Sequence, residues 1–211
     1  MNIQNTMPST PNSQLPTPNG AQRAAMFGLD ARIALGIFAV IAMVAGGTMV
    51  MNLDDQKAKA LASEVADTGK AIEAIHYDLK ADLWLSLLNP SEKNAFMALY
   101  DNGVIMEEGQ RRGRWNGPYI RATSNRHNSY GEMLLRKRQE NHKNECTDPL
   151  ELCYVWLVYG KVKPGVAESL NQFLDDKELA PETTGRVQWT PDGDYVNLYY
   201  RATKALSTQT D

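Results

Sequence analysis

Two cysteines and three histidines carry the side chains with which this chain could most readily do chemistry. Cys146 and Cys153 are its only cysteines, and a bond between them would close a loop of eight residues. In the chain-entropy model such a loop stabilises a fold by about 2.5 kcal/mol. The rival is a metal site that adds His142, four residues before Cys146, but this spacing matches no standard zinc pattern. The sequence therefore favours a Cys146–Cys153 disulfide over a metal site.

No catalytic constellation stands out. His76, His127 and His142 are scattered, without a Ser-His-Asp order or a phosphate-binding loop. Calcium could bind aspartate oxygens in the C-terminal part, although Asp-Gly turns are commoner than calcium sites. The aspartates concerned are Asp175, Asp176, Asp192 and Asp194. We expect a protein that is not an enzyme and that needs no cofactor and no metal.

The charge is arranged in blocks. The chain has a net charge of −3, but Arg111 to Lys143 carries nine basic and two acidic residues, a difference of +7. Such a stretch can bind phosphates. It lacks interleaved aromatic residues and a nucleic-acid motif, so we expect no nucleic-acid partner.

An apolar run of nineteen residues without a charge, Ile33–Met51, precedes the rest of the chain. As a helix it would be roughly 28 Å long, close to the hydrocarbon thickness of a bilayer, which predicts a transmembrane helix. Arg23 and Arg32 precede the run, whereas Asp54 and Asp55 follow it. Because cytoplasmic flanks favour basic residues, the amino terminus is predicted inside the cell and the large domain outside.

A second helical pattern follows directly and is amphipathic. Its apolar stripe repeats at spacings of three and four residues, as one face of a helix does. The stripe comprises Ala58, Leu61, Val65, Thr68, Ile72, Ile75, Leu79 and Leu83. Asn89-Pro90 is expected to end this helix. We therefore divide the chain into a disordered leader (1–28), a transmembrane helix (29–53), an amphipathic continuation of that helix (54–88) and an α+β globular domain (89–211).

The globular domain reads as two short helices and an antiparallel sheet. Ser91 is expected to cap a helix that runs to about Tyr100, and a long irregular connection follows from Gly103 to Ser129. A second helix is expected from Val166 to about Asp176. Strands are predicted at Tyr154–Val162 and, around a turn at Pro191-Asp192-Gly193, at Arg186–Thr190 and Tyr195–Ala202, with Glu132–Arg138 as a weaker candidate.

Together these features resemble a type IV pilin-like protein or type II secretion pseudopilin, in a divergent bacterial branch. Gly28-Leu29 matches the family's cleavage point, where a prepilin peptidase cuts after the glycine. The more specific match resembles the W-x-G-P-Y-L segment of pseudopilins: Trp115-Asn116-Gly117-Pro118-Tyr119-Ile120. The likeness covers nearly all of the chain after Met26.

The resemblance implies a pilin-like α+β fold, in which a long N-terminal helix, transmembrane in its first half, packs on a C-terminal antiparallel sheet. It also implies methylation, a place in the bacterial inner membrane with a periplasmic domain, and a non-enzymatic role in a filament or secretion machine. The implied partners are prepilin peptidase, the inner membrane and, through the N-terminal helix, other pilin-like subunits. The runner-up is an uncleaved, single-pass anchor that holds a periplasmic binding domain.

One position departs from the family. Ile33 stands where the family usually has a glutamate that pairs with the terminal amine of a neighbouring subunit. Asp30 and Arg32 are the only charges nearby, and a carboxylate in a membrane is costly unless it is paired. We take these two residues as the candidate assembly charges. A different role is expected for the motif: it should anchor the irregular connection onto the sheet and not bind a ligand. Its residues are Trp115, Gly117, Pro118 and Tyr119.

Overall fold

The computed structural model describes residues 20–147, 151–176 and 183–206, and between residues 20 and 52 it places side chains only at 35, 37–40, 42 and 43. The chain divides into two units, Met1–Thr48 and Met49–Asp211. Helix α1, Gly20–Leu79, contributes residues to both. It begins inside the segment expected to be a disordered leader.

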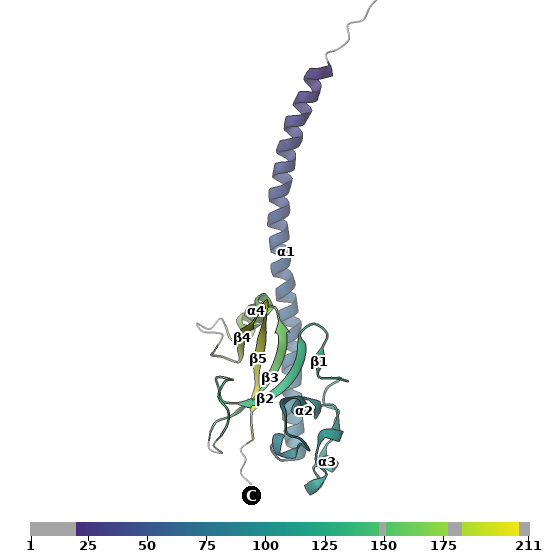
Figure 1. The fold of residues 1–211 in the computed structure, drawn as a ribbon, viewed down its shortest axis with the longest axis vertical. Helices are drawn as coiled ribbons and strands as arrows, with labels where there is room; N and C mark the ends of the chain where they lie inside the picture. The colour runs from purple at the N-terminus through teal and green to yellow at the C-terminus, as the bar shows by residue number, and fades with distance from the viewer. Residues whose placement is uncertain (1–19, 148–150, 177–182, 207–211) are drawn as a thin grey trace, which may run out of the picture. The chain divides into compact units, whose positions relative to one another are not determined.

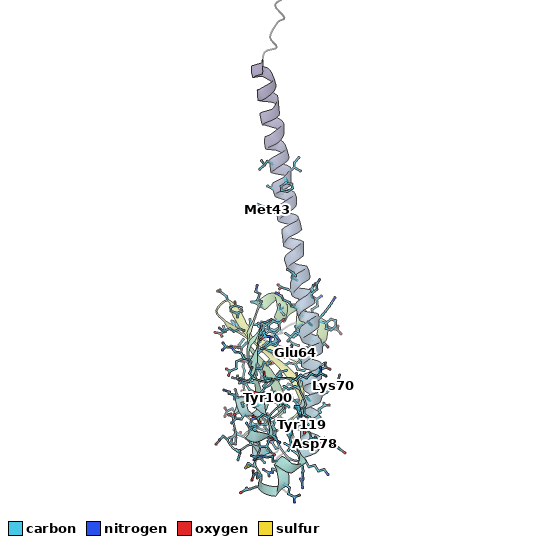
Figure 2. The ribbon with its side chains drawn as sticks, turned by 90° about the vertical axis from the view of Figure 1, so that its right-hand side faces the viewer. Met43, Glu64, Lys70, Asp78, Tyr100 and Tyr119 are labelled. Carbon is cyan, nitrogen blue, oxygen red and sulfur yellow. A yellow bond between two sulfur atoms is a disulfide. The ribbon has the colours of Figure 1, made fainter. Side chains whose placement is uncertain are left out.

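In the first unit, every described side chain of α1 is apolar and exposed. Leu35 is 71% exposed and Phe38 is 72% exposed. Met43, which Figure 2 labels, is 78% exposed. With 3.6 residues per turn, the seven described positions between 35 and 43 point in all directions around the helix. Within the described residues, no helix is long and apolar enough to cross a membrane. Most side chains of Ile33–Met51 lie outside the described part, so the transmembrane helix stays a prediction.

The second unit is α+β, built on a five-stranded antiparallel sheet with the order β1-β2-β3-β5-β4 (Figure 1). The strands are β1 Arg126–His127, β2 Gly131–Arg138, β3 Tyr154–Val162, β4 Val187–Asp192 and β5 Tyr195–Lys204. The shorter helices are α2 Glu92–Met97, α3 Arg111–Arg114 and α4 Pro164–Leu174, with 3-10 turns at Trp84–Ser86, Asn102–Val104 and Glu108–Gln110. This arrangement confirms the α+β class and the antiparallel sheet.

One face of the sheet, which we call the inner face, packs under the second half of α1. All eight residues of the predicted stripe are buried, and the seven apolar ones share one core with Leu135, Leu157 and Leu198 of the sheet. The opposite, outer face has its own smaller cluster, formed by Trp156, Val158 and Tyr199. The stripe prediction is therefore confirmed, and α1 is the main cover of the inner face.

The predicted end of the amphipathic helix at residue 88 is wrong, because α1 stops at Leu79. Lys80 adopts a left-handed conformation with φ of 51°. Asp82 Oδ1 then accepts the backbone N–H groups of Trp84 and Leu85 and starts a 3-10 turn. Leu83 nevertheless stays buried, so the apolar spacing continues past the end of the helix that suggested it.

Most of the predicted strand and helix boundaries lie within two residues of the observed ones. β3 has the predicted bounds, and Ser91 caps α2 by accepting the Asn94 N–H at 3.1 Å. α2 ends at Met97, three residues before the expected end at Tyr100. In the predicted hairpin, Pro191 belongs to β4, and Gly193, at φ of 61°, makes the turn.

Strand β4 forms one edge of the sheet, and residues of α4 and its C-terminal cap cover the backbone groups at that edge. Asn171 Nδ2 donates to Val187 O at 3.3 Å, and Asp175 Oδ2 accepts the N–H groups of both Arg186 and Val187 at 2.7 Å. Pro191 has no N–H to offer. An edge protected in this way resists pairing with another strand. Asp175, considered above as a calcium ligand, thus binds the backbone N–H groups at the β4 edge.

Candidate functional site

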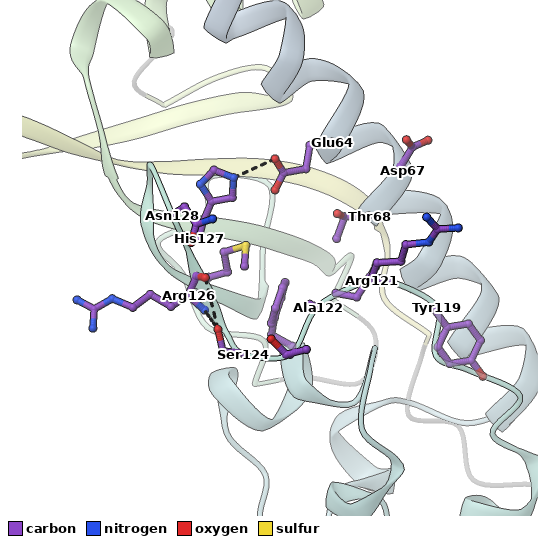
Figure 3. Close-up of a pocket in the computed structure, with 14 residues that line it drawn as sticks. Glu64, Asp67, Thr68, Tyr119, Arg121, Ala122, Ser124, Arg126, His127 and Asn128 are labelled. Carbon is purple, nitrogen blue, oxygen red and sulfur yellow. Dashed lines mark hydrogen bonds and ion pairs between the residues drawn. The ribbon is translucent and has the colours of Figure 1, made fainter.

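A groove of about 590 Å³ lies between α1 and the segment 119–128 (Figure 3). This volume is within the range of small-molecule sites. Phe96, Ile120 and Met133 give it apolar walls. Polar residues line both sides: Glu64, Asp67 and Thr68 from α1, and Arg121, Ser124 and His127 from the opposite segment.

The Glu64 carboxylate has a partner at each of its oxygens. Its Oε1 accepts the Tyr159 hydroxyl at 2.9 Å, and its Oε2 lies 3.3 Å from His127 Nε2. Burial and the nearby Glu64 carboxylate raise the pKa of Tyr159 well above its ordinary value, so Tyr159 keeps its proton and donates it. Glu64 thus links α1 to β1 and β3.

The hydrogen bonds of His127 fix its tautomer. Nδ1 accepts the backbone N–H groups of Ser129 and Tyr130 at 3.0 and 3.1 Å, so the ring proton is on Nε2 and faces Glu64. The ring also stacks on Tyr130 at 4.7 Å. Both ring nitrogens of His127 are therefore engaged within the chain.

Charge of both signs lines the rim. Asp67 lies 3.0 Å from Lys70 on α1, and Arg121 is exposed on the opposite side. Ser124 is exposed and bonds within its own segment, where its Oγ accepts the Arg126 N–H at 3.3 Å. A ligand would therefore meet one acidic wall, the basic side chains of Arg121 and Arg126, and apolar walls. This combination suits a dipolar group such as a peptide segment.

The predicted motif lies near the groove, and Trp115 and Tyr119 pack against each other. Their ring centroids are 5.5 Å apart with an angle of 84° between the planes. The Gly117–Pro118 peptide bond is cis. A Cβ on Gly117 would lie 2.5 Å from the Trp115 ring, so the contact requires a glycine there.

The hydrogen bonds of this segment go to the helical side of the domain. Trp115 Nε1 donates to Ala98 O at 2.8 Å, and the Tyr119 hydroxyl donates to Asp78 Oδ2 at 2.6 Å, at the end of α1 shown in Figure 2. Burial and Asp78 both raise the pKa of Tyr119. The hydrogen bonds of the segment thus go to α1 and to the residues after α2, while the side chains of Trp115, Tyr119 and Ile120 pack against the core that α1 shares with the sheet.

The two cysteines form the predicted disulfide, Cys146–Cys153. Cys153 is buried directly before β3, whereas Cys146 is only partly covered. The sulfurs are thus bonded to each other, and His142 bonds Gln188 instead of joining them. No group of three or more potential metal ligands occurs among the described residues.

The predicted processing site is described only by its backbone. Gly28 and Leu29 fall within α1, and the side chains of Asp30, Arg32 and Ile33 lie outside the described part. The structure therefore leaves the processing and assembly roles as predictions. The Glu64–His127 contact was missed because 63 positions separate the two residues and only the sheet and α1 bring them together.

Comparison of the chain with protein-family models, with curated proteins and with solved structures finds no match.

Proposed function

We propose that the chain is a non-enzymatic, membrane-anchored subunit, pilin- or pseudopilin-like, of a type IV filament or a type II secretion machine. The observation that supports this proposal most is that every described side chain of α1 within the first unit is apolar and exposed. A helix that is apolar all round is stable only inside lipid or among other apolar helices. The exposed residues between 35 and 43 present such a surface to solvent in the isolated chain.

The fold of the second unit also supports the proposal. A helix stripe buried on one face of an antiparallel sheet gives a rigid domain attached to the apolar segment by a continuous chain. The Gly28-Leu29 dipeptide and the Trp115–Ile120 segment add the family resemblance. In this role the apolar helix binds the inner membrane and sister helices, and the peptidase removes residues 1–28.

Processing is tested by mass spectrometry of the amino terminus in the native host. We expect the mature chain to start at Leu29, and Gly28→Ala to retain the leader. Gly20→Ala is the matched control, because it changes the other glycine of the leader and should leave cleavage intact. A wild-type chain that keeps Met1 to Gly28 would remove the main support for a processed subunit.

Assembly is tested separately with a photo-crosslinking side chain in the apolar segment. At Phe38 or Met43, both strongly exposed, the crosslinker should capture another pilin-like subunit in membranes. The same crosslinker at Tyr77, which is 80% exposed at the far end of α1, is the comparison and should give a different pattern. Capture of lipid alone at Phe38 and Met43 would contradict assembly through this segment.

The second candidate is an uncleaved anchor that holds a periplasmic binding domain, and the groove favours it. Glu64, Arg121 and the apolar walls offer a small peptide a charge pair and an apolar contact. An intact leader together with saturable binding of a peptide that Glu64→Gln weakens would select this candidate.

A further inference from the structure

Residues 139–145 form a loop that covers the outer face of the sheet. Trp156 Nε1 donates to Gln139 O at 3.0 Å, and Gln188 Nε2 donates to Glu140 O at 3.0 Å. At the centre of the loop His142 is only 3% exposed. Its ring centroid lies 4.1 Å from that of Tyr199, on which it stacks, and 5.9 Å from that of Trp156. The imidazole is therefore the buried contact between the loop and the sheet.

The hydrogen bonds of Gln188 fix the state of that imidazole. Because Gln188 Nε2 donates to Glu140 O and to Gly185 O, its Oε1 must be the acceptor for His142 Nδ1, 2.5 Å away. The ring proton is thus on Nδ1. Nε2 is buried and has no hydrogen-bond partner in the described part of the chain. The closed loop holds His142 neutral, with one bare nitrogen.

Protonation would place a second N–H at Nε2, where no acceptor meets it. The groups nearby also oppose a cation. Lys143 of the loop and Arg136 of β2 repel it, and the Arg136 guanidinium already lies 5.6 Å from the centre of the Tyr199 ring. The two carboxylates of the loop are engaged elsewhere: Glu140 pairs with Arg201 at 2.7 Å, and Glu145 lies 3.5 Å from Arg138.

We propose that residues 139–145 are an acid-opened cover, in which protonation of His142 releases the loop and uncovers Trp156 and Tyr199. The Cys146–Cys153 disulfide keeps the released loop tethered to the start of β3. Release would break the bonds from Gln188 and Trp156 but leave β3 and β5 paired, since their ladder does not involve the loop. The device is independent of the function proposed above.

The direction of the pH effect follows from the two states. Burial lowers the pKa of His142 below its ordinary value of 6.5 in the closed state. The open state, exposed to water, binds the proton more tightly. The closed state is thus fully favoured above about pH 6.5 and loses stability as the pH falls toward the lowered pKa, and within that window the open-to-closed ratio rises about tenfold per pH unit.

Hydrogen exchange of the full-length chain, read by mass spectrometry between pH 7.5 and 5.5 and divided by the intrinsic rate at each pH, tests the proposal. We expect peptides covering 139–147 to lose protection as the pH falls, and peptides of β4 and β5 to keep theirs. Unchanged protection of the loop would overturn the proposal, and so would a parallel loss in the sheet, which indicates global unfolding.

Two variants identify the titrating group. His142→Phe keeps the stacked ring, and His142→Gln keeps an N–H donor toward Gln188; neither can be protonated, so both should abolish the pH dependence of the loop. His76→Gln is the matched control, because His76 is also buried, on α1, with its pKa lowered by burial, and it should keep that dependence. Persistence of the pH dependence in either His142 variant would assign it to another group.

Discussion

The two faces of the sheet are held by different forces. The inner face is covered by α1 and packed mainly with apolar side chains, among them the fully buried Leu135, Leu157 and Leu198, with the hydroxyl of Tyr159 donating to Glu64. The outer face has an aromatic cluster under a loop held by side-chain hydrogen bonds and ion pairs. Apolar burial responds little to pH or redox conditions, whereas the buried His142 responds to pH and the Cys146–Cys153 disulfide beside the loop responds to reduction. The inner face should therefore set the stability of the domain, and the outer face its sensitivity to the surroundings.

The largest effect should come from the inner face. Leu157→Ala removes a fully buried side chain from the centre of β3, and we expect the free energy of unfolding to fall by about 2 to 5 kcal/mol. Leu134→Ala, on the outer face of the adjacent strand, is the matched control. Leu134 is only partly buried, so its loss should be about 1 kcal/mol. Urea denaturation of the purified chain measures both, and equal losses would break the comparison.

Trp115 tests whether the connection after α2 belongs to the inner-face core. Trp115→Ala removes a half-buried ring packed against that core and the hydrogen bond to Ala98 O, and we expect a loss of about 3 kcal/mol. Trp115→Phe keeps most of the ring and should lose about 1 kcal/mol. If Trp115→Ala leaves the melting temperature unchanged but abolishes binding of a partner, the segment is an interaction site.

Elements that depend on local periodicity could be predicted from the sequence. The buried stripe of α1, the bounds of β3 and the Ser91 cap each depend on residues within a few positions of one another. The end of α1 could not be predicted, because the spacing of Leu79 and Leu83 is helical although the backbone between them is not. Apolar spacing reports which residues are buried, and it does not report that the helix has stopped.

The polar contacts between residues far apart in the chain could not be predicted from the sequence. Glu64 meets His127, and His142 meets Gln188, only after the register of the strands is set. Nothing in the local sequence distinguishes these histidines from His76, which is buried on α1. The candidate site was therefore missed, whereas the disulfide could be predicted because the chain holds only two cysteines.

The disulfide should have a moderate effect, confined to the outer face. Replacing both Cys146 and Cys153 with alanine opens a loop of eight residues, and we expect a loss of about 2.5 kcal/mol. Hydrogen exchange should show the loss of protection in residues 139–147 before any change in β4. Reduction of the wild-type chain is the control and should reproduce the result. A loss of protection that begins in α1 would mean that the disulfide supports the inner face instead.

The smallest effect should come from the arginines on the outer face. The Arg201 guanidinium lies 5.0 Å from the centre of the Tyr154 ring and pairs with Glu140 at 2.7 Å. Arg201→Lys keeps the charge for Glu140 but loses the planar group over the ring, so we expect a loss of about 0.5 to 1 kcal/mol, measured by urea denaturation. Repeating the measurement at 1 M salt separates the two contacts, because salt screens an ion pair at the surface more strongly than a packed ring contact. A loss that vanishes in salt would assign Arg201 to the ion pair alone, and the outer face would then be tied by charge and not by its aromatic cluster.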